Sequence, residues 1–223
     1  IRPWWFEEFD FLATTSDYVS KTYSNAFSMS LNKCIVTGYP RNDIILSEIN
    51  IINDKDLANK IDSSSSVICY APTFRDQDRD YTYIIDWEHL GSYLIKNNIL
   101  LIIKFHMNEN KELLIKNDNI VVLNKKYDLY PLLSYFDCLI TDYSSIFLDY
   151  LLLKKPILFF VFDKDQYIQK NRTFYEPISE FLPGPLVNDT NQLVQKLDEL
   201  LFKNKNLYKD QIDFLLKKYH FFI

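Results

Sequence analysis

Short apolar runs alternate with amphipathic stretches through most of this chain. From residue 66 onward, runs rich in Val, Ile, Leu and Phe predict buried strands at Val67–Tyr70, Leu100–Phe105, Ile120–Leu123, Cys138–Thr141 and Pro156–Val161. Between them, apolar residues at helical spacing predict helices at Asp86–Lys96, Leu129–Phe136 and Ser144–Leu153, with a short turn near Glu109–Leu114. This alternation predicts an α/β domain with a Rossmann-like, doubly wound parallel sheet, and the near-continuous apolar strands indicate that helices cover both of its faces.

The two flanks of the alternating region carry shorter patterns. Before it, the pattern predicts two strands around one helix: Phe9–Thr14, Tyr18–Met29 and Cys34–Thr37. After it, apolar residues recur at helical spacing from Leu193 to Leu201. We expect a nucleotide-binding domain over residues 66–190 and C-terminal helices over residues 191–223. Residues 1–65 are expected to be a linker and the end of a preceding domain, or the start of the Rossmann-like domain.

Composition and charge narrow the class of protein. The 223 residues are 48% hydrophobic and 16% aromatic, which favours a packed core over a disordered chain. The formal net charge of -5 disfavours duplex nucleic acid as a partner, because such binding usually needs a basic face. The widely spaced Cys34, Cys69 and Cys138 lie in apolar runs, so we expect buried thiols in a reducing, cytoplasmic compartment. The first residue is Ile and no signal-peptide pattern follows it, so we expect the chain to be part of a longer protein.

Polar residues follow four of the predicted strands, at the edge where parallel sheets bind ligands. These strand ends are Ala71–Asp76, Lys104–His106, Thr141–Ser145 and the pair Asp163 and Asp165. In the third, the strand runs into a helix that opens with two serines, and the unpaired N–H groups of a helix start favour phosphate. Asp142 or Ser144 can instead cap this helix, and the two interpretations are compatible.

Lys104 and His106 lie two residues apart at the end of one predicted strand. Alternation places both side chains on the same side, where an ammonium and an imidazole can hold a diphosphate and the imidazole can move a proton. A structural role is the alternative for a single histidine in such a place. The chain holds three glycines and no glycine-rich phosphate loop, which disfavours nicotinamide dehydrogenases and P-loop hydrolases.

The sequence offers little support for a metal site. Asp76, Asp78 and Asp80 alternate as in a calcium loop, but Tyr81 and Trp87 occupy the positions that require Gly and Glu. No Cys-x-x-Cys pair suggests zinc. We therefore interpret the aspartates as solvated loop charges and expect neither a metal ion nor a cofactor.

Several segments, in a fixed order, resemble one family. They are Thr37–Asp43, Tyr70–Asp76, Lys104–His106, Asp137–Tyr150, Lys155–Ile157 and Leu182–Pro185. Together they resemble the glycerophosphotransferases that use CDP-glycerol to build teichoic acid or capsule polymers. The resemblance extends from about residue 10 to about residue 190, and the family's His-Gly-Thr-Pro-Leu-Lys segment, thought to serve the acceptor side, is absent from this chain.

The resemblance implies the C-terminal, donor-binding half of a glycosyltransferase-B architecture. The expected donor is CDP-glycerol, and the expected reaction passes glycerol phosphate to a hydroxyl of a growing polymer with release of CMP. The resemblance and the strand ends together give one candidate catalytic residue, His106. They give seven candidate donor-binding residues: Arg75, Lys104, Thr141, Asp142, Ser144, Ser145 and Asp149.

The implied partners are a nucleotide-linked donor and a polymer or lipid-linked acceptor. The acceptor implies peripheral association with the inner face of the membrane, although no apolar run reaches the roughly 18 residues of a membrane span. Two departures from the family pattern, Met107 and Thr173, leave CDP-ribitol or another nucleotide-linked donor open. A glycosyltransferase that uses a nucleotide sugar and a non-catalytic binding domain are the remaining alternatives.

Overall fold

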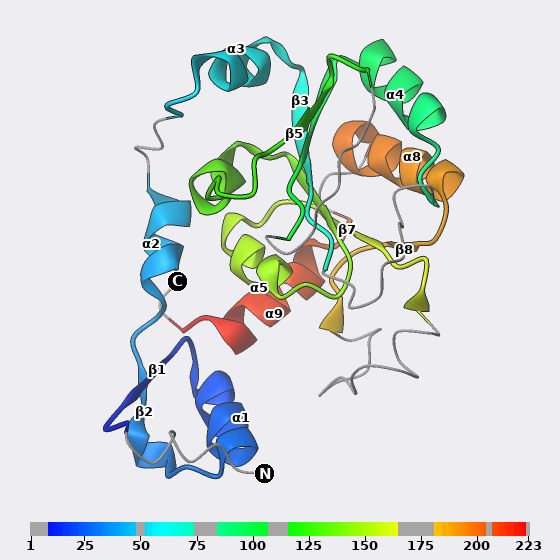
Figure 1. Cartoon of the computed structure of the whole chain (residues 1–223). Coiled ribbons are helices and arrows are strands. Elements are labelled where there is room, and N and C mark those ends of the chain that lie inside the picture. Colours follow the sequence, from blue (N-terminus) through cyan, green and yellow to red (C-terminus); the bar gives the residue numbers. More distant parts are fainter. Residues whose placement is uncertain are drawn as a thin grey trace.

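The computed structural model describes residues 9–47, 52–73, 84–106, 116–164, 181–203 and 207–221, and its centre is a six-stranded parallel sheet (Figure 1). The strands are β3 (Ser66–Tyr70), β4 (Ile99–Ile103), β5 (Ile120–Val122), β6 (Cys138–Thr141), β7 (Ile157–Phe160) and β8 (Leu186–Val187). They lie in the order β5-β4-β3-β6-β7-β8, and every neighbouring pair is parallel. The chain thus builds outward from β3 in one direction and then from β6 in the other, which is the doubly wound order. The predicted fold class is confirmed.

Helices cover both faces of the sheet because the strand side chains alternate between two cores. One core joins Ile68, Leu101 and Ile140 to helices α4 (Trp87–Lys96) and α8 (Thr190–Asp198). The opposite core joins alternate residues such as Cys69 and Leu139 to the other helical elements. These are α2 (Pro40–Leu46), α3 (Lys55–Ser63), η4 (Tyr130–Tyr135), α5 (Ile146–Tyr150), η5 (Leu151–Leu153) and α9 (Lys209–Tyr219). Every residue of β3, β4, β6 and β7 is buried, as their apolar composition predicts.

Two predicted helices have a different form in the structure. The segment predicted as Leu129–Phe136 is the 3-10 helix η4, with Pro131 at its start, where a missing N–H costs nothing. The segment predicted as Ser144–Leu153 is α5 followed by the 3-10 helix η5, which ends at Lys154 in a left-handed conformation. The short turn predicted near Glu109–Leu114 lies outside the described residues.

A smaller unit precedes the sheet. Strands β1 (Leu12–Thr14) and β2 (Cys34–Val36) form a separate two-stranded parallel sheet, connected through helix α1 (Asp17–Phe27) and the 3-10 turn η2 (Leu31–Lys33). Ser16 caps α1 by accepting from the Val19 N–H. The C-terminal helix returns to this unit, because the Ser16 hydroxyl donates to the Lys218 carbonyl at 2.7 Å and the Phe221 N–H donates to the Thr15 carbonyl at 2.9 Å. The end of α9 therefore lies beside the start of α1 (Figure 1).

The last described segments are helices that pack against the sheet domain. After α8 comes a short π-helix, η6 (Glu199–Lys203), and then α9, whose Ile212, Leu215 and Leu216 are buried in the core. Among the described helices, none is both long and apolar enough to cross a bilayer.

Candidate functional site

The two loops at the centre of the sheet, after β3 and after β6, are joined by hydrogen bonds. The Thr141 hydroxyl donates to the Ala71 carbonyl at 2.7 Å. The Asp142 carboxylate accepts from the Thr73 N–H at 2.9 and 3.0 Å and from the Thr73 hydroxyl at 2.5 Å. Because β3 and β6 are the strands at which the direction of the sheet order reverses, this is where an open α/β sheet binds its ligand.

Asp142 also fixes the loop that leads into α5. Its Oδ1 accepts from the N–H groups of Tyr143 at 2.6 Å and Ser144 at 3.3 Å. Thr141 and Asp142 are 0% and 1% exposed, so their side chains lie beneath the surface and hold the two loops together. Their predicted contact with a donor stays a prediction, and the structure adds a positioning role for both.

Ser144 and Ser145 present their hydroxyls at the start of α5. Ser145 occupies the N-cap position but makes no capping bond through its side chain. Within the described part of the chain, neither hydroxyl has a hydrogen-bond partner, and Ser145 is exposed while Ser144 is half-buried. Both hydroxyls are therefore available to a ligand at the carboxyl edge of β6.

Lys104 and His106 follow β4, the next strand along the same edge. The Lys104 ammonium donates to the carbonyls of Asn124 at 2.8 Å and Lys125 at 2.7 Å, and partial burial lowers its pKa. Two of its three N–H groups thus hold the loop after β5, which leaves one for a ligand. His106 is exposed, and Phe105 between it and Lys104 is buried. These contacts do not show whether Lys104 and His106 bind a diphosphate, so this role stays a prediction.

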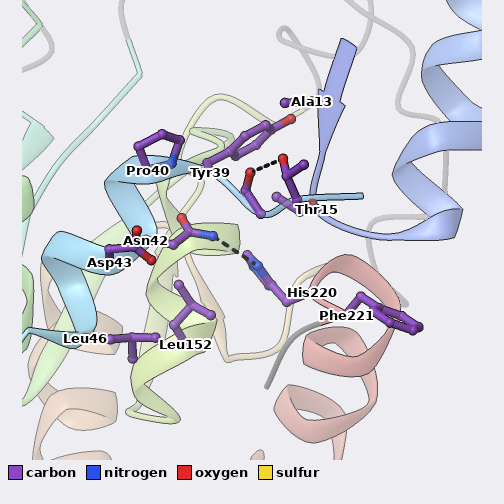
Figure 2. A pocket seen from close by; sticks show the side chains of 12 residues that line it. Ala13, Thr15, Tyr39, Pro40, Asn42, Asp43, Leu46, Leu152, His220 and Phe221 are labelled. Carbon is purple, nitrogen blue, oxygen red and sulfur yellow. Dashed lines mark hydrogen bonds between the residues drawn. The ribbon is translucent and has the colours of Figure 1, made fainter. Parts of the chain in front are cut away.

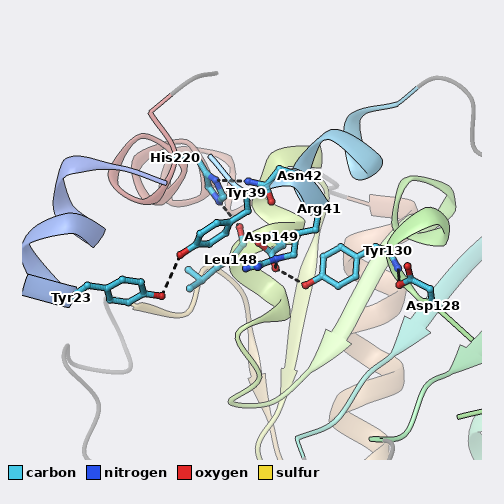
Figure 3. A network of polar contacts seen from close by, with 9 residues as sticks. All are labelled: Tyr23, Tyr39, Arg41, Asn42, Asp128, Tyr130, Leu148, Asp149 and His220. Carbon is cyan, nitrogen blue, oxygen red and sulfur yellow. Dashed lines mark hydrogen bonds and ion pairs between the residues drawn. The ribbon is translucent and has the colours of Figure 1, made fainter. Parts of the chain in front are cut away.

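Asp149 is paired within the protein (Figure 3). Its Oδ2 accepts from the Arg41 Nε at 3.0 Å and from the Tyr130 hydroxyl at 2.8 Å, and the residue is 4% exposed. Its carboxylate therefore links α5 to α2 and η4, and its direct contact with a donor stays a prediction. Arg41 is absent from the predicted set, although it lies in the segment Thr37–Asp43 that carries the family resemblance. Burial raises the pKa of Tyr130, and the neighbouring Asp149 carboxylate adds to this shift.

Arg75, the remaining predicted donor-binding residue, lies outside the described residues. So do Asp76, Asp78 and Asp80. In the described ranges, no cluster of three or more His, Cys, Asp or Glu side chains is placed to bind a metal ion.

A separate cavity of about 300 Å³ lies where the small N-terminal unit, α2, η5 and the C-terminal segment meet (Figure 2). His220 and Asn42 line it, and the His220 Nδ1 lies 3.5 Å from the Asn42 Nδ2. The His220 Nε2 lies 2.8 Å from the Leu148 carbonyl, to which it donates. With Nε2–H as the donor, neutral His220 accepts at Nδ1, and burial lowers its pKa.

Comparison with known proteins places the chain in a family. The sequence model described as CDP-Glycerol:Poly(glycerophosphate) glycerophosphotransferase matches residues 6–222. The chain belongs to this family. The predicted resemblance is confirmed, and the match covers nearly the whole chain.

The curated relatives that match this chain are named as enzymes of teichoic acid synthesis. The chain is 33% identical to a teichoic acid poly(glycerol phosphate) polymerase of Staphylococcus epidermidis, over 92% of this chain and 30% of the relative. It is 32% identical to the teichoic acid ribitol-phosphate polymerase TarL of Staphylococcus aureus, over 82% of this chain and 35% of the relative. The chain therefore spans about a third of the length of these two relatives.

A solved structure from the same group supports the fold. The wall teichoic acid polymerase TagF superposes with a TM-score of 0.78 at 32% identity, over 94% of this chain and 53% of that one. The chain thus corresponds to about half of that structure and shares its glycosyltransferase-B fold. A complex of Staphylococcus aureus MnaA with UDP also superposes, with a TM-score of 0.59, but at 14% identity this likeness shows the fold alone.

Proposed function

We propose that this chain is the donor-binding part of a glycerophosphotransferase. It binds CDP-glycerol at the carboxyl edge of β3, β4 and β6 and supports transfer of glycerol phosphate to a growing teichoic acid or capsule polymer. The observation that carries the proposal is the set of hydrogen bonds made by Asp142. They join the loops after β3 and β6 and leave the Ser144 and Ser145 hydroxyls available to a ligand. Membership of the glycerophosphotransferase family supports the same donor.

The proposed reaction exchanges one phosphorus–oxygen bond for another. A hydroxyl oxygen of the acceptor attacks the phosphorus that carries glycerol, and the bond from that phosphorus to CMP breaks. CMP leaves with the bonding electrons, and the hydroxyl proton passes to a base or to solvent. Positioning and charge neutralisation supply most of the catalysis in such a transfer.

We assign the described site residues separate roles in this transfer. Ser144 and Ser145 donate hydrogen bonds to the diphosphate, and Lys104 adds its remaining N–H and its charge. His106 donates a hydrogen bond or a proton to the leaving phosphate, as an exposed imidazole at the strand end can do. Thr141 and Asp142 act indirectly, by holding the loop that carries the two serines.

A relative in the ribitol group favours CDP-ribitol as a second candidate donor, because its identity to this chain is nearly the same, at 32%. We propose CDP-glycerol first because the description of the family names this donor. We also place the reaction at the cytoplasmic face of the membrane, with peripheral association through a lipid-linked acceptor. Co-flotation of the chain with liposomes, with and without such an acceptor, tests this placement.

Calorimetry and thermal shift with CDP, CMP, CDP-glycerol, CDP-ribitol and UDP-sugars test the donor. A ligand at 100 times its Kd stabilises the folded state by about 2.7 kcal/mol, which a melting curve detects. We expect CDP-glycerol to give the largest stabilisation. Stabilisation by UDP-sugars alone would support a nucleotide-sugar enzyme, and no response to any nucleotide would leave a non-catalytic domain.

Point substitutions test the placement. Ser145→Ala and His106→Ala should each weaken CDP-glycerol binding by about 1–3 kcal/mol, the scale of a lost hydrogen bond to a charged group. The matched controls Ser92→Ala and His89→Ala change the same residue types at exposed positions of α4 and should leave binding unchanged. Unchanged binding in both site variants would remove the diphosphate from this edge of the sheet.

A further inference from the structure

Arg41 is held rigidly although its side chain is 44% exposed (Figure 3). Its Nε donates to the Asp149 Oδ2 at 3.0 Å. Its guanidinium carbon lies 4.3 Å from the ring centroid of Tyr39 and 5.9 Å from that of Tyr130. The Tyr39 hydroxyl lies 3.3 Å from the Tyr23 hydroxyl, so the ring against the guanidinium is itself held by α1. The guanidinium is therefore held at its Nε edge by Asp149 and lies over the ring of Tyr39.

The outer edge of this guanidinium carries unused donors. Asp149 takes the Nε–H, and in the described part of the chain neither Nη makes a hydrogen bond or an ion pair. Two Nη groups side by side form the fork that matches two oxygens of a phosphate. The Arg41–Asp149 pair alone does not need this fork, because one Nε–H contact already joins the two residues.

The fork lies close to the proposed phosphate site. Asp149 is four residues after Ser145 along α5, which corresponds to about 6 Å at 1.5 Å per residue. The guanidinium contacts that carboxylate directly. Arg41 therefore contacts α5 about one helical turn beyond Ser145.

We propose that Arg41 binds a phosphate group of a substrate through its two Nη groups, and that Asp149 and Tyr130 are positioning residues that hold the guanidinium. This inference rests on the proposed function and adds a residue to it. The shared chemistry is a phosphate oxyanion, which belongs either to the diphosphate of the donor or to a phosphodiester of the acceptor. It also gives Asp149 an indirect role in place of direct contact with the donor.

Binding of two probes to the purified chain separates these sources. CDP-glycerol and a short glycerol phosphate oligomer are titrated by calorimetry against wild type, Arg41→Gln and Arg41→Lys. Gln can still donate to Asp149 but has no charge, and Lys keeps the charge but lacks the fork. We expect Arg41→Gln to weaken one probe by about ten- to a hundredfold, the scale of a lost charged hydrogen bond, and Arg41→Lys to weaken it less. The exposed Lys96→Gln on α4 removes the same charge elsewhere and should change neither affinity.

The outcomes are distinct. Weaker binding of CDP-glycerol assigns Arg41 to the donor, and weaker binding of the oligomer alone assigns it to the acceptor. If wild type binds CDP-glycerol and Arg41→Gln binds both probes with wild-type affinity, the Arg41 inference is wrong and the proposed function stands. If wild type binds neither probe, both are overturned.

A double-mutant cycle tests the positioning role of Asp149. Asp149→Asn should weaken the same probe as Arg41→Gln, but it should add little in the Arg41→Gln background, because its effect passes through Arg41. Equal weakening by Asp149→Asn in both backgrounds would show a merely structural role and would contradict the inference. Melting temperatures of the four proteins show which changes come from lost stability.

Discussion

Replacing Asp142 with Asn tests whether the link between the two central loops stabilises the fold and the site. The substitution keeps the size of the side chain and removes its charge. In the structure, Asp142 Oδ1 accepts from both the Thr73 N–H and hydroxyl and from the N–H groups of Tyr143 and Ser144, while Oδ2 accepts from the Thr73 N–H. An amide offers one oxygen and one nitrogen, so it cannot accept at both positions.

The magnitude follows from these contacts. A hydrogen bond to a charged group contributes about 1.5–3 kcal/mol and a neutral one about 0.5–1.5 kcal/mol, so each bond that remains at Oδ1 weakens. The new Nδ2 also lies against the N–H of Thr73, where Oδ2 had accepted at 3.0 Å. Because Asp142 is 1% exposed, water cannot replace the lost partner. We expect the free energy of unfolding to fall by about 2–4 kcal/mol, a large part of the usual 5–15 kcal/mol of a domain.

Urea unfolding at pH 7 measures this change. Asp54→Asn is the matched control, because Asp54 caps α3 at an exposed position and Asn caps a helix equally well. The control should change the free energy of unfolding by less than about 0.5 kcal/mol. A loss below about 1 kcal/mol in Asp142→Asn would refute the reasoning, since that is the worth of a single ordinary hydrogen bond. CDP-glycerol affinity should fall in the same variant, because the loop that carries Ser144 loses its anchor.

Two further predictions concern pH and backbone geometry. Burial lowers the pKa of His220 in the folded state, so the unfolded state binds more protons below the ordinary value of about 6.5 and stability falls as pH drops from 7 to 5. His220→Gln should flatten this dependence in melting temperatures measured across that range, and an unchanged slope would assign the dependence to other groups. A Cβ at Gly184 would lie 2.0 Å from the Ile157 carbonyl oxygen, so Gly184→Ala should cost about 3 kcal/mol or more by urea unfolding. Gly38→Ala meets no atom within 4 Å and should cost about 1–2 kcal/mol for its φ of +73° alone; a larger loss than in Gly184→Ala would contradict the packing argument.

The sheet could be predicted from the sequence because its central strands are buried on both faces. The segments Ile99–Ile103 and Ile157–Phe160 are uninterrupted runs of apolar residues, which indicate this burial directly. The order of the strands could not be predicted, because it depends on contacts between residues far apart in the chain. The form of η4 was also missed, although Pro131 near its start was a local signal of a different turn.

The candidate site was predicted as a set of loops, and its internal contacts were not. Alternation put Lys104 and His106 on the same side of β4, but it cannot show that the Lys104 ammonium lies on the carbonyls after β5. The sequence predicts Asp142 as a helix cap or a donor-binding residue, whereas in the structure its main partner is Thr73, 69 residues earlier. Arg41 was missed because its partner Asp149 is 108 residues away. Its place in a segment that resembles the family was the one signal that could have indicated it.

The orientation of α5 depends on hydrogen bonds from outside the helix. A helix of five residues is too short to be stable by itself, so its orientation must come from tertiary contacts. Those contacts come from three directions: Asp142 fixes the entry loop, Arg41 holds Asp149, and His220 donates to the Leu148 carbonyl. Two of these hydrogen bonds come from Arg41 of α2 and from His220 after α9, both next to the small N-terminal unit. The geometry of the Ser144 and Ser145 hydroxyls therefore depends on how that unit packs against the sheet.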